Sequence, residues 1–291
     1  MPSVGAAQQY MYYDELVWPM NNKLAIDPCN ISSLRALLER HNFTFKKSLG
    51  QNFLTCPQTA DKIITALQPD AQTHVIECGS GAGALSARLM NATPHVTAID
   101  IDKRVFLLLE DVAPGAKIIH CDMLKVDFTA LISQSNRTVA VANLPYYITS
   151  EAILKLLSAP FERIVIMIQK EVVARLVAQP GDEALTAFSI LVQLQADVKH
   201  LFNVGRHCFT PQPNVDSAVV MLTPYAIQPQ LELLQLVKNG YANRRKTLVN
   251  NLQSYGREKV VAALAGCNIN ACARAETLTI DDWRQLEAAL L

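Results

Sequence analysis

The sequence lacks an excess of either charge. It holds 26 lysines and arginines against 26 aspartates and glutamates, which gives a formal net charge of zero at pH 7. A protein that binds polyanions over its whole surface needs a large excess of basic over acidic residues, so the neutral charge argues against this class of protein. Any contact with nucleic acid must come from local groups of cations, and such groups occur at 46–47, 206–207 and 244–246.

The sequence also lacks the signatures of metal sites, disulfide frameworks and membrane segments. None of its 7 cysteines forms a Cys-x-x-Cys pair, and the closest two, Cys267 and Cys272, have no histidine nearby. We therefore expect free cysteines in a reducing compartment and no metal. No apolar run is long enough to span a bilayer, and the first residues do not resemble a signal peptide. These absences favour a cytoplasmic protein.

The sequence does contain enough apolar residues for a core, and its segments alternate between predicted strands and predicted helices. Half of its 291 residues are hydrophobic and 18% are charged, as in globular proteins. Short apolar strands are expected at 74–78, 96–101, 117–120, 138–142 and 163–168. Helices are expected at 31–40, 57–67, 84–90, 150–157 and 171–177. Strand and helix alternate, which predicts an α/β fold with a doubly wound, mainly parallel sheet.

The pattern changes near both ends of the chain. Residues 1–28 show weak periodicity and several prolines, which predicts a poorly ordered extension. Residues 29–224 form the α/β domain in this interpretation. After residue 224 only helices are expected, at 231–241, 244–253, 258–265 and 281–290. Residues 225–291 therefore form a predicted small helical domain.

A glycine-rich turn follows the first strand of the sheet. Gly79 and Gly81 belong to a Gly-x-Gly-x-Gly run, which allows a ligand to approach the backbone closely. Glu77 precedes this run, where a carboxylate would repel a pyrophosphate. Asp100 and Asp122 end or follow the next two strands, where acids can bind ribose hydroxyls and an adenine amino group. The set favours a cationic nucleoside, S-adenosylmethionine, over the alternatives of a nucleotide-binding or purely structural turn.

The segment Asn143-Leu144-Pro145-Tyr146 follows the fourth strand, at the edge of the sheet where ligands bind. The Asn143 amide oxygen and the Leu144 carbonyl can each accept one hydrogen of an adenine amino group. Pro145 keeps Leu144 extended, and Tyr146 offers a ring on which a base can stack. This arrangement predicts direct methyl transfer to an extruded adenine. The alternative is an ordinary Asn-Pro loop with a packed tyrosine.

These motifs resemble those of the ribosomal RNA adenine dimethyltransferases, particularly the branch that acts on the small-subunit (16S) RNA. The resemblance runs from about residue 43 to the C-terminus and includes the stretches 46–54, 209–218 and 241–248. It implies that Gln51, Asn52 and Leu54 line the cofactor pocket, together with Gly79, Asp100, Asp122 and Asn143. It departs from the family at 183–188, where the family has a Tyr-Gly-containing stretch.

The resemblance also implies roles in RNA recognition. Phe209 becomes a second aromatic near the flipped adenine, with an ordinary core phenylalanine as the alternative. The candidate RNA-binding cations are Lys46, Lys47, Arg206, Arg244, Arg245 and Lys246. In this interpretation the remaining catalytic residues are Asn143, Leu144, Pro145 and Tyr146, and the cofactor set also holds Glu77 and Gly81.

The resemblance implies a Rossmann-like class I methyltransferase fold with a seven-stranded sheet. It further implies N6,N6-dimethylation of two adjacent adenines in the 3′-terminal hairpin of 16S RNA, without a metal. The expected partner is a small-subunit assembly intermediate, and the enzyme is expected to be a monomer. Three alternatives stay open: a large-subunit RNA methyltransferase of the macrolide-resistance type, a DNA adenine methyltransferase, and a non-catalytic RNA-binding or assembly factor.

Overall fold

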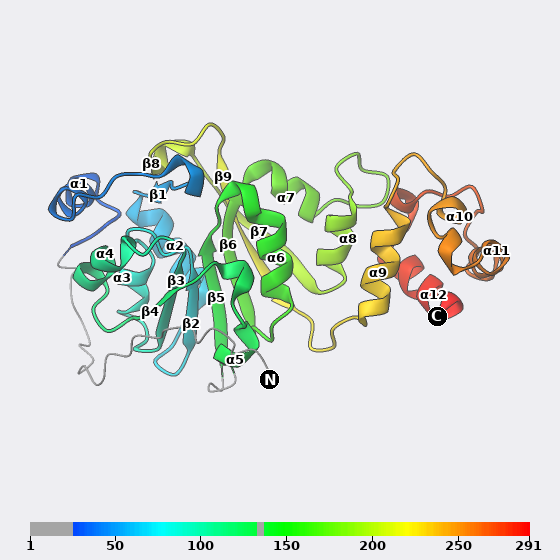
Figure 1. Ribbon diagram of the computed structural model, residues 1–291, viewed down its shortest axis with the longest axis horizontal. Coiled ribbons are helices and arrows are strands. Elements are labelled where there is room, and N and C mark those ends of the chain that lie inside the picture. Colours follow the sequence, from blue (N-terminus) through cyan, green and yellow to red (C-terminus); the bar gives the residue numbers. More distant parts are fainter. Residues whose placement is uncertain (1–25, 133–136) are drawn as a thin grey trace, which may run out of the picture.

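The computed structural model describes residues 26–132 and 137–291. At its centre lies a seven-stranded sheet in the order β4-β3-β2-β5-β6-β9-β7 (Figure 1). The strands are β2 (His74–Cys78), β3 (Val96–Asp100), β4 (Lys117–His120), β5 (Thr138–Asn143), β6 (Arg163–Gln169), β7 (Ala196–Val204) and β9 (Ser217–Pro224). A two-stranded ribbon joins β1 (Phe53–Leu54) to β8 (Phe209–Thr210) in antiparallel register. Of the poorly ordered extension predicted for residues 1–28, residues 1–25 lie outside the described residues, and Asp27 forms an ion pair with Arg88 at 2.9 Å.

Helices cover both faces of the sheet, which confirms the doubly wound prediction. Parallel pairing joins the five strands from β4 to β6. The helices between and around them are α1 (Ile31–Arg40), α2 (Pro57–Leu67), α3 (Ser86–Leu89), α4 (Val105–Val112), α5 (Phe128–Ile132), α6 (Thr149–Leu157) and α7 (Lys170–Leu176). Successive strand residues point to opposite faces, so Val75 joins the hydrophobic cluster with α2 and α4, and Ile76 joins the cluster with α6.

Strands β7 and β9 are the part of the sheet that the sequence pattern did not locate. Strand β9 is antiparallel to both β6 and β7, so the chain reverses here instead of continuing the strand–helix alternation. Strand β7 forms the edge of the sheet, and much of it is exposed. Its mixed polar and apolar sequence therefore lacks the continuous apolar run of a buried parallel strand.

The C-terminal region is helical, as predicted, with α9 (Leu231–Gly240), α10 (Leu248–Asn251), α11 (Arg257–Gly266) and α12 (Ile280–Leu290). Its core also contains residues from before position 225. Leu185, Ile190 and Leu194 share one hydrophobic cluster with Trp283 and Leu286. Helix α8 (Ala187–Gln193) thus packs between the sheet and the C-terminal helices (Figure 1).

The predicted helix at 244–253 is wrong. The chain makes turns up to Thr247, and α10 covers only Leu248–Asn251. The cause is Asn243, whose side chain accepts a hydrogen bond from the Arg245 N–H at 3.2 Å. An asparagine side chain that bonds the backbone two residues ahead stabilises a turn in place of a helix. The basic residues 244–246 therefore lie on an exposed turn.

The atypical segment 183–188 leads into α8 and packs against the C-terminal helical region. Leu185 is buried in the core of the C-terminal helices, and Thr186 caps α8 by accepting a hydrogen bond from the Ser189 N–H. The Arg244 side chain donates to the Glu183 carbonyl at 2.9 Å. In the described ranges, no helix combines the length and the apolar character needed to cross a membrane.

Candidate functional site

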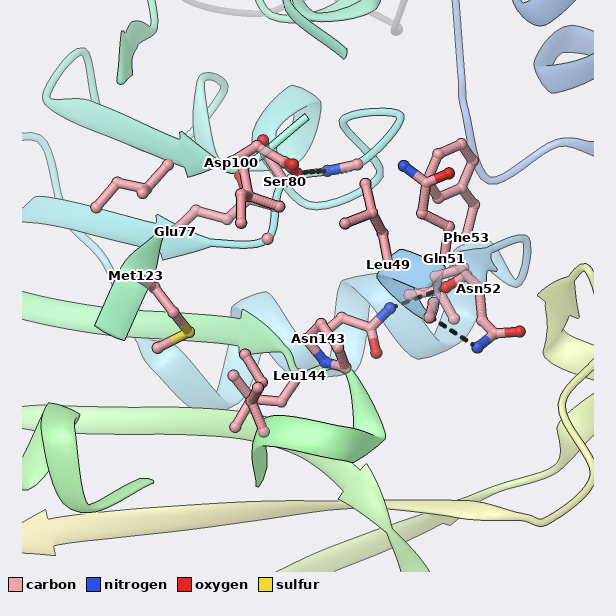
Figure 2. A pocket seen from close by; sticks show the side chains of 18 of the residues that line it. Leu49, Gln51, Asn52, Phe53, Glu77, Ser80, Asp100, Met123, Asn143 and Leu144 are labelled. Atoms are coloured by element: carbon pink, nitrogen blue, oxygen red, sulfur yellow. Dashed lines mark hydrogen bonds between the residues drawn. The ribbon is translucent and has the colours of Figure 1, made fainter. Parts of the chain in front are cut away.

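A cavity of about 310 Å³ opens at the carboxyl ends of β2, β3 and β5. This is the edge of an open parallel sheet where ligands bind. Figure 2 shows side chains converging on it from the glycine turn, from the loop before α2 and from the end of β5. The sequence-predicted residues that line it are Gln51, Asn52, Leu54, Glu77, Gly79, Gly81, Asp100, Asp122, Asn143, Leu144, Pro145, Tyr146 and Phe209.

The glycine turn has a backbone that other residues would strain. Gly79 has φ +76° and Gly81 has φ +53°, in the left-handed region. A Cβ on Gly81 would also lie 2.9 Å from the Phe53 ring. Two constraints, conformation and space, therefore select glycine at position 81, and they hold the turn close to the strand that carries Phe53.

Asp100 and Glu77 place two buried carboxyl groups beside this turn. Asp100 accepts hydrogen bonds from the Gly81 N–H at 3.0 Å and from the Asp102 N–H at 2.8 Å. Burial nevertheless raises the pKa of Asp100. Glu77 is only 2% exposed and accepts a hydrogen bond from the Ser86 hydroxyl. Burial, and secondly the charge of Asp100, raises the pKa of Glu77 to about 8.

Asn143 is oriented by a hydrogen bond to the opposite wall of the cavity. Its Nδ2 donates to the Asn52 carbonyl at 3.1 Å (Figure 2). Because the amide nitrogen is committed to that carbonyl, the two ends of the side chain are distinguished and Oδ1 is the acceptor. Asn52 in turn donates through its own side chain to the Gly50 carbonyl at 3.0 Å. These two hydrogen bonds connect the end of β5 to the loop 50–52, next to the glycine turn.

The residues that follow Asn143 leave the sheet in a fixed direction. The Leu144 N–H donates to the Met167 carbonyl at 3.1 Å, which continues the contact between β5 and β6. Pro145, with φ −58° and ψ 134°, precedes a short 3-10 turn, η3 (Tyr146–Ile148). The Tyr146 hydroxyl shares a 3.0 Å hydrogen bond with Ser217, and burial raises its pKa. Its ring is thereby held against the start of β9.

Phe209 reaches the cavity through the β1–β8 ribbon, where it pairs with Leu54. It is 4% exposed and belongs to the main hydrophobic cluster as well as to the cavity lining. Phe209 is therefore a core residue that also forms part of the cavity wall, and its contact with the flipped adenine stays a prediction.

Several cavity residues escaped the sequence argument. Ser80, Ile101, Met123 and Tyr147 also line the cavity. The Ser80 hydroxyl is buried and has no hydrogen-bond partner within the described residues. A buried unpaired hydroxyl is costly unless a ligand supplies the partner. Only its place in the glycine turn could have indicated this residue from the sequence.

The sequence argument also missed Asp102, which orients the cavity residue Gln51 by a hydrogen bond. The Gln51 side chain donates to Asp102 at 2.9 Å and accepts from the Lys46 N–H at 2.8 Å. The Arg104 guanidinium also bonds Asp102 and is the main cause that holds its pKa at about 2. Gln51 therefore lines the cavity while its amide fixes the loop to the end of β3.

The six candidate RNA-binding cations do not line the cavity, and all are exposed. Lys46 and Lys47 adjoin the 3-10 turn η1 (Lys47–Leu49), whose last residue is part of the cavity wall. Arg206 begins the turn that leads to Phe209, and its side chain donates to the Asn214 carbonyl at 3.2 Å. The cations at 244–246 lie on the turn between α9 and α10. Among the described residues, no three His, Cys, Asp or Glu side chains are grouped to hold a metal.

The strand order, the glycine turn after β2 and the acids after β3 and β4 together define a Rossmann-like fold of the class I methyltransferase type. Residues 42–290 match the family model described as ribosomal RNA adenine dimethylase. The chain belongs to the ribosomal RNA adenine dimethylase family.

Individual relatives agree with this assignment. The chain is 40% identical to the "Ribosomal RNA small subunit methyltransferase A" of Ligilactobacillus salivarius, over 90% of this chain and 95% of the relative. Another protein of that name, from Streptococcus gordonii, is 39% identical over 89% of this chain and 96% of its own length. A dimethyladenosine transferase structure from Plasmodium falciparum superposes with a TM-score of 0.69 at 27% identity, covering 80% of this chain and 95% of the other.

Proposed function

We propose that the protein uses S-adenosylmethionine to dimethylate the N6 amino groups of two adjacent adenines in the 3′-terminal hairpin of 16S ribosomal RNA. The family assignment supports the reaction class, and the relatives named for the small ribosomal subunit support the substrate. The observation that carries the proposal is the orientation of Asn143, whose amide nitrogen bonds Asn52 and whose oxygen is left as an acceptor beside the glycine turn.

The cavity suits the cofactor in both shape and polarity. Asp100 lies at the end of β3, where a carboxylate can accept hydrogen bonds from ribose hydroxyls. We assign Asp122 to the adenine amino group and Met123 and Ile101 to the apolar face of the base, because all three line the cavity. Ser80 offers a buried hydroxyl that has no hydrogen-bond partner among residues 26–132 and 137–291. S-Adenosylmethionine supplies an electrophilic methyl group on a sulfonium.

The residues of this chain activate the amino group of the target adenine by accepting its hydrogens in a fixed orientation. Asn143 Oδ1 and the Leu144 carbonyl each accept one hydrogen of the target amino group, which localises the nitrogen lone pair and aims it at the methyl carbon. S-Adenosylmethionine, held by Asp100, Asp122 and the glycine turn, would supply the methyl group to this lone pair, and its sulfur would keep the electron pair of the broken C–S bond. The proton released from nitrogen passes to water. Positioning and electrostatics supply the catalysis, because no strong general base is required.

The target adenine must leave its stack to reach these acceptors. Tyr146 and Phe209 line the cavity from two different elements, and we assign them to the two sides of the extruded base. The tyrosine hydroxyl bonds Ser217, which holds the ring in place before RNA binds. Preorganisation of this kind lowers the entropic cost of binding.

We assign the candidate cations Lys46, Lys47, Arg206, Arg244, Arg245 and Lys246 to the phosphates of the RNA. Neutral overall charge suits recognition of a folded RNA by such local groups. The proposed substrate is an assembly intermediate of the small subunit, and the proposed active form is a monomer. The division into an S-adenosylmethionine domain at 29–224 and a helical domain at 225–291 also remains a proposal.

The test is incubation of the protein with labelled S-adenosylmethionine and small ribosomal subunits that lack the modification. Nucleoside analysis of the RNA is expected to yield N6,N6-dimethyladenine. Parallel reactions with large subunits and with DNA cover the two rival substrates, and primer extension locates the modified bases. Binding of the small subunit without transfer to any substrate would support the non-catalytic assembly factor instead.

One structural relative is of the large-subunit type. The 23S rRNA methyltransferase ErmE superposes with a TM-score of 0.62 at 24% identity, which establishes a common fold and nothing more. The higher identity, 40% over 90% of this chain, to a relative named for the small subunit favours the first substrate.

A further inference from the structure

The rim of the cavity carries an aromatic side chain that the proposed mechanism leaves unused. Tyr147 lines the cavity, yet it is 58% exposed. Its neighbour Tyr146 is half-buried and hydrogen-bonded to Ser217. Both belong to the 3-10 turn η3, in which successive side chains diverge by about 120° because there are three residues per turn. One tyrosine is therefore held by the protein, and the next one is presented to solvent.

The Tyr147 ring is supported by a glycine on the opposite wall. Gly50 has φ +60°, and a Cβ at this position would lie 3.4 Å from two carbons of the Tyr147 ring. The Gly50 carbonyl accepts the Asn52 side-chain amide, and the Asn52 carbonyl accepts the Asn143 amide. Two successive hydrogen bonds thus connect Gly50, which contacts the Tyr147 ring, to Asn143, which is proposed to bind the target amino group (Figure 2).

We propose that Tyr147 is a stacking site for the unpaired base that adjoins the target adenine in the RNA chain. This inference rests on the proposed function and adds a second base-binding position to it. When an adenine is extruded, its neighbour loses a stacking partner on one face. An exposed aromatic ring at the rim replaces that partner, and it does so for any base because every base has a π-face.

The surroundings of Tyr147 suit a nucleotide. Lys46 and Lys47 are exposed and belong to the start of the turn that ends at Gly50, so two cations able to bind RNA phosphates lie three and four residues before the glycine that contacts the ring. If Tyr147 merely shielded the cavity from water, its removal would weaken binding of the cofactor as much as binding of the RNA. If Tyr147 stacks on a base, its removal weakens binding of the RNA alone, so the two roles can be separated by experiment.

The experiment compares Tyr147→Ala and Tyr147→Phe with the wild type on unmethylated small ribosomal subunits. Loss of one base stack is expected to raise the KM for the subunit about ten-fold in the alanine variant, with the phenylalanine variant close to wild type. The Kd for S-adenosylmethionine, measured by equilibrium dialysis, is expected to stay the same in both. Tyr225→Ala is the matched control, because Tyr225 is also exposed (41%) but lies outside the cavity lining.

A second measurement uses RNA hairpins with 2-aminopurine on either side of the target adenine. Stacking on Tyr147 is expected to quench the fluorescence of one of these probes, and Tyr147→Ala is expected to abolish that change. The inference is overturned if the KM for the subunit is unchanged in Tyr147→Ala, if it rises equally in Tyr147→Phe, or if the Kd for the cofactor rises in either variant. In each of these cases methylation by the wild type leaves the proposed function standing. If the wild type transfers no methyl group, the proposed function fails, and the fluorescence result still decides whether Tyr147 contacts a base.

Discussion

At the scale of single residues, the acceptor amide is the group on which the proposed chemistry depends. Asn143 holds its orientation through one hydrogen bond to Asn52 and has no charge to contribute. Its effect on the rate must therefore come from accepting a hydrogen of the substrate in a fixed geometry.

Replacing Asn143 with alanine is expected to lower kcat for methyl transfer by about 10²–10³, the usual cost of removing one preorganised polar group from an active site. The Kd for the cofactor should change far less. Steady-state transfer from labelled S-adenosylmethionine measures the first quantity and equilibrium dialysis the second. Asn91→Ala, on an exposed asparagine outside the cavity lining, is the control, and a kcat within a few-fold of wild type for Asn143→Ala would contradict the assignment.

Glu77 gives the molecule a pH-dependent stability. Burial raises its pKa from 4.5 to about 8, so the folded protein holds this proton more tightly than the unfolded chain does. The unfolded state binds fewer protons between these two values, and the free energy of unfolding therefore falls as the pH rises through that window. The slope contributed by one group is at most about 1.4 kcal/mol per pH unit.

Glu77→Gln removes the charge and keeps the hydrogen-bond acceptor for Ser86. Urea unfolding at pH 5 and pH 8 is expected to show a smaller loss of stability in this variant than in the wild type. Glu39→Gln changes an exposed glutamate and should leave the difference between the two pH values as it is. Equal pH dependence in wild type and Glu77→Gln would mean that the buried carboxyl titrates normally.

At the scale of elements, the C-terminal helices depend on a close approach between α9 and α12. A Cβ on Gly240, the last residue of α9, would overlap the ring of the fully buried Trp283 on α12. Tyr241 stacks on the same indole with ring centroids 6.0 Å apart. The glycine is needed for space, because the tryptophan fills the centre of this small core.

Gly240→Ala is expected to lower the free energy of unfolding by about 1–3 kcal/mol, the usual penalty for overpacking a core. Gly266→Ala is the matched control at the end of α11, where the added Cβ would meet no described atom within 4 Å apart from its chain neighbours and its own helix backbone. Greater helix propensity should make that change neutral or stabilising by up to about 1 kcal/mol. Both values come from urea unfolding, and equal values for the two variants would rule out the packing argument.

At the scale of the whole molecule, the proposed RNA contacts are distributed between two regions. Lys46, Lys47 and Arg206 lie in short turns that lead to the cavity residues Leu49 and Phe209, and the turn between α9 and α10 carries the cations 244–246. Since the net charge is zero, attraction to RNA must come from these positions. Arg244 already donates to Glu183, so Arg245 and Lys246 are the better candidates for phosphates.

Arg245→Ala is expected to weaken the affinity for the small subunit a few-fold and to reduce the slope of log K against log salt by about one. Arg35→Ala removes an exposed cation from α1, at the opposite end of the molecule, and should change neither quantity (Figure 1). Filter binding across a series of salt concentrations measures both. Equal slopes for wild type and Arg245→Ala would remove this turn from the RNA interface.

The local patterns of the sequence sufficed for the five parallel strands and for the polar cavity residues at their ends, whereas Gln51, Asn52, Leu54 and Phe209 were indicated only by the family resemblance. Strands such as β2 and β5 are buried on both faces, so their continuous apolar runs are visible without tertiary information. The helix expected at 244–253 failed because the Asn243 side chain competes for backbone N–H groups, a local effect that apolar periodicity does not register.

The sequence by itself determined the doubly wound sheet, the glycine turn and the polar residues at the strand ends, because each depends on residues that are close in the chain. Only the tertiary structure decided which way the Asn143 amide faces, where Tyr147 lies and how α8 joins the C-terminal core. These features arise from contacts such as that between Asn52 and Asn143, whose partners are far apart in the chain and meet only when the sheet and its loops have assembled.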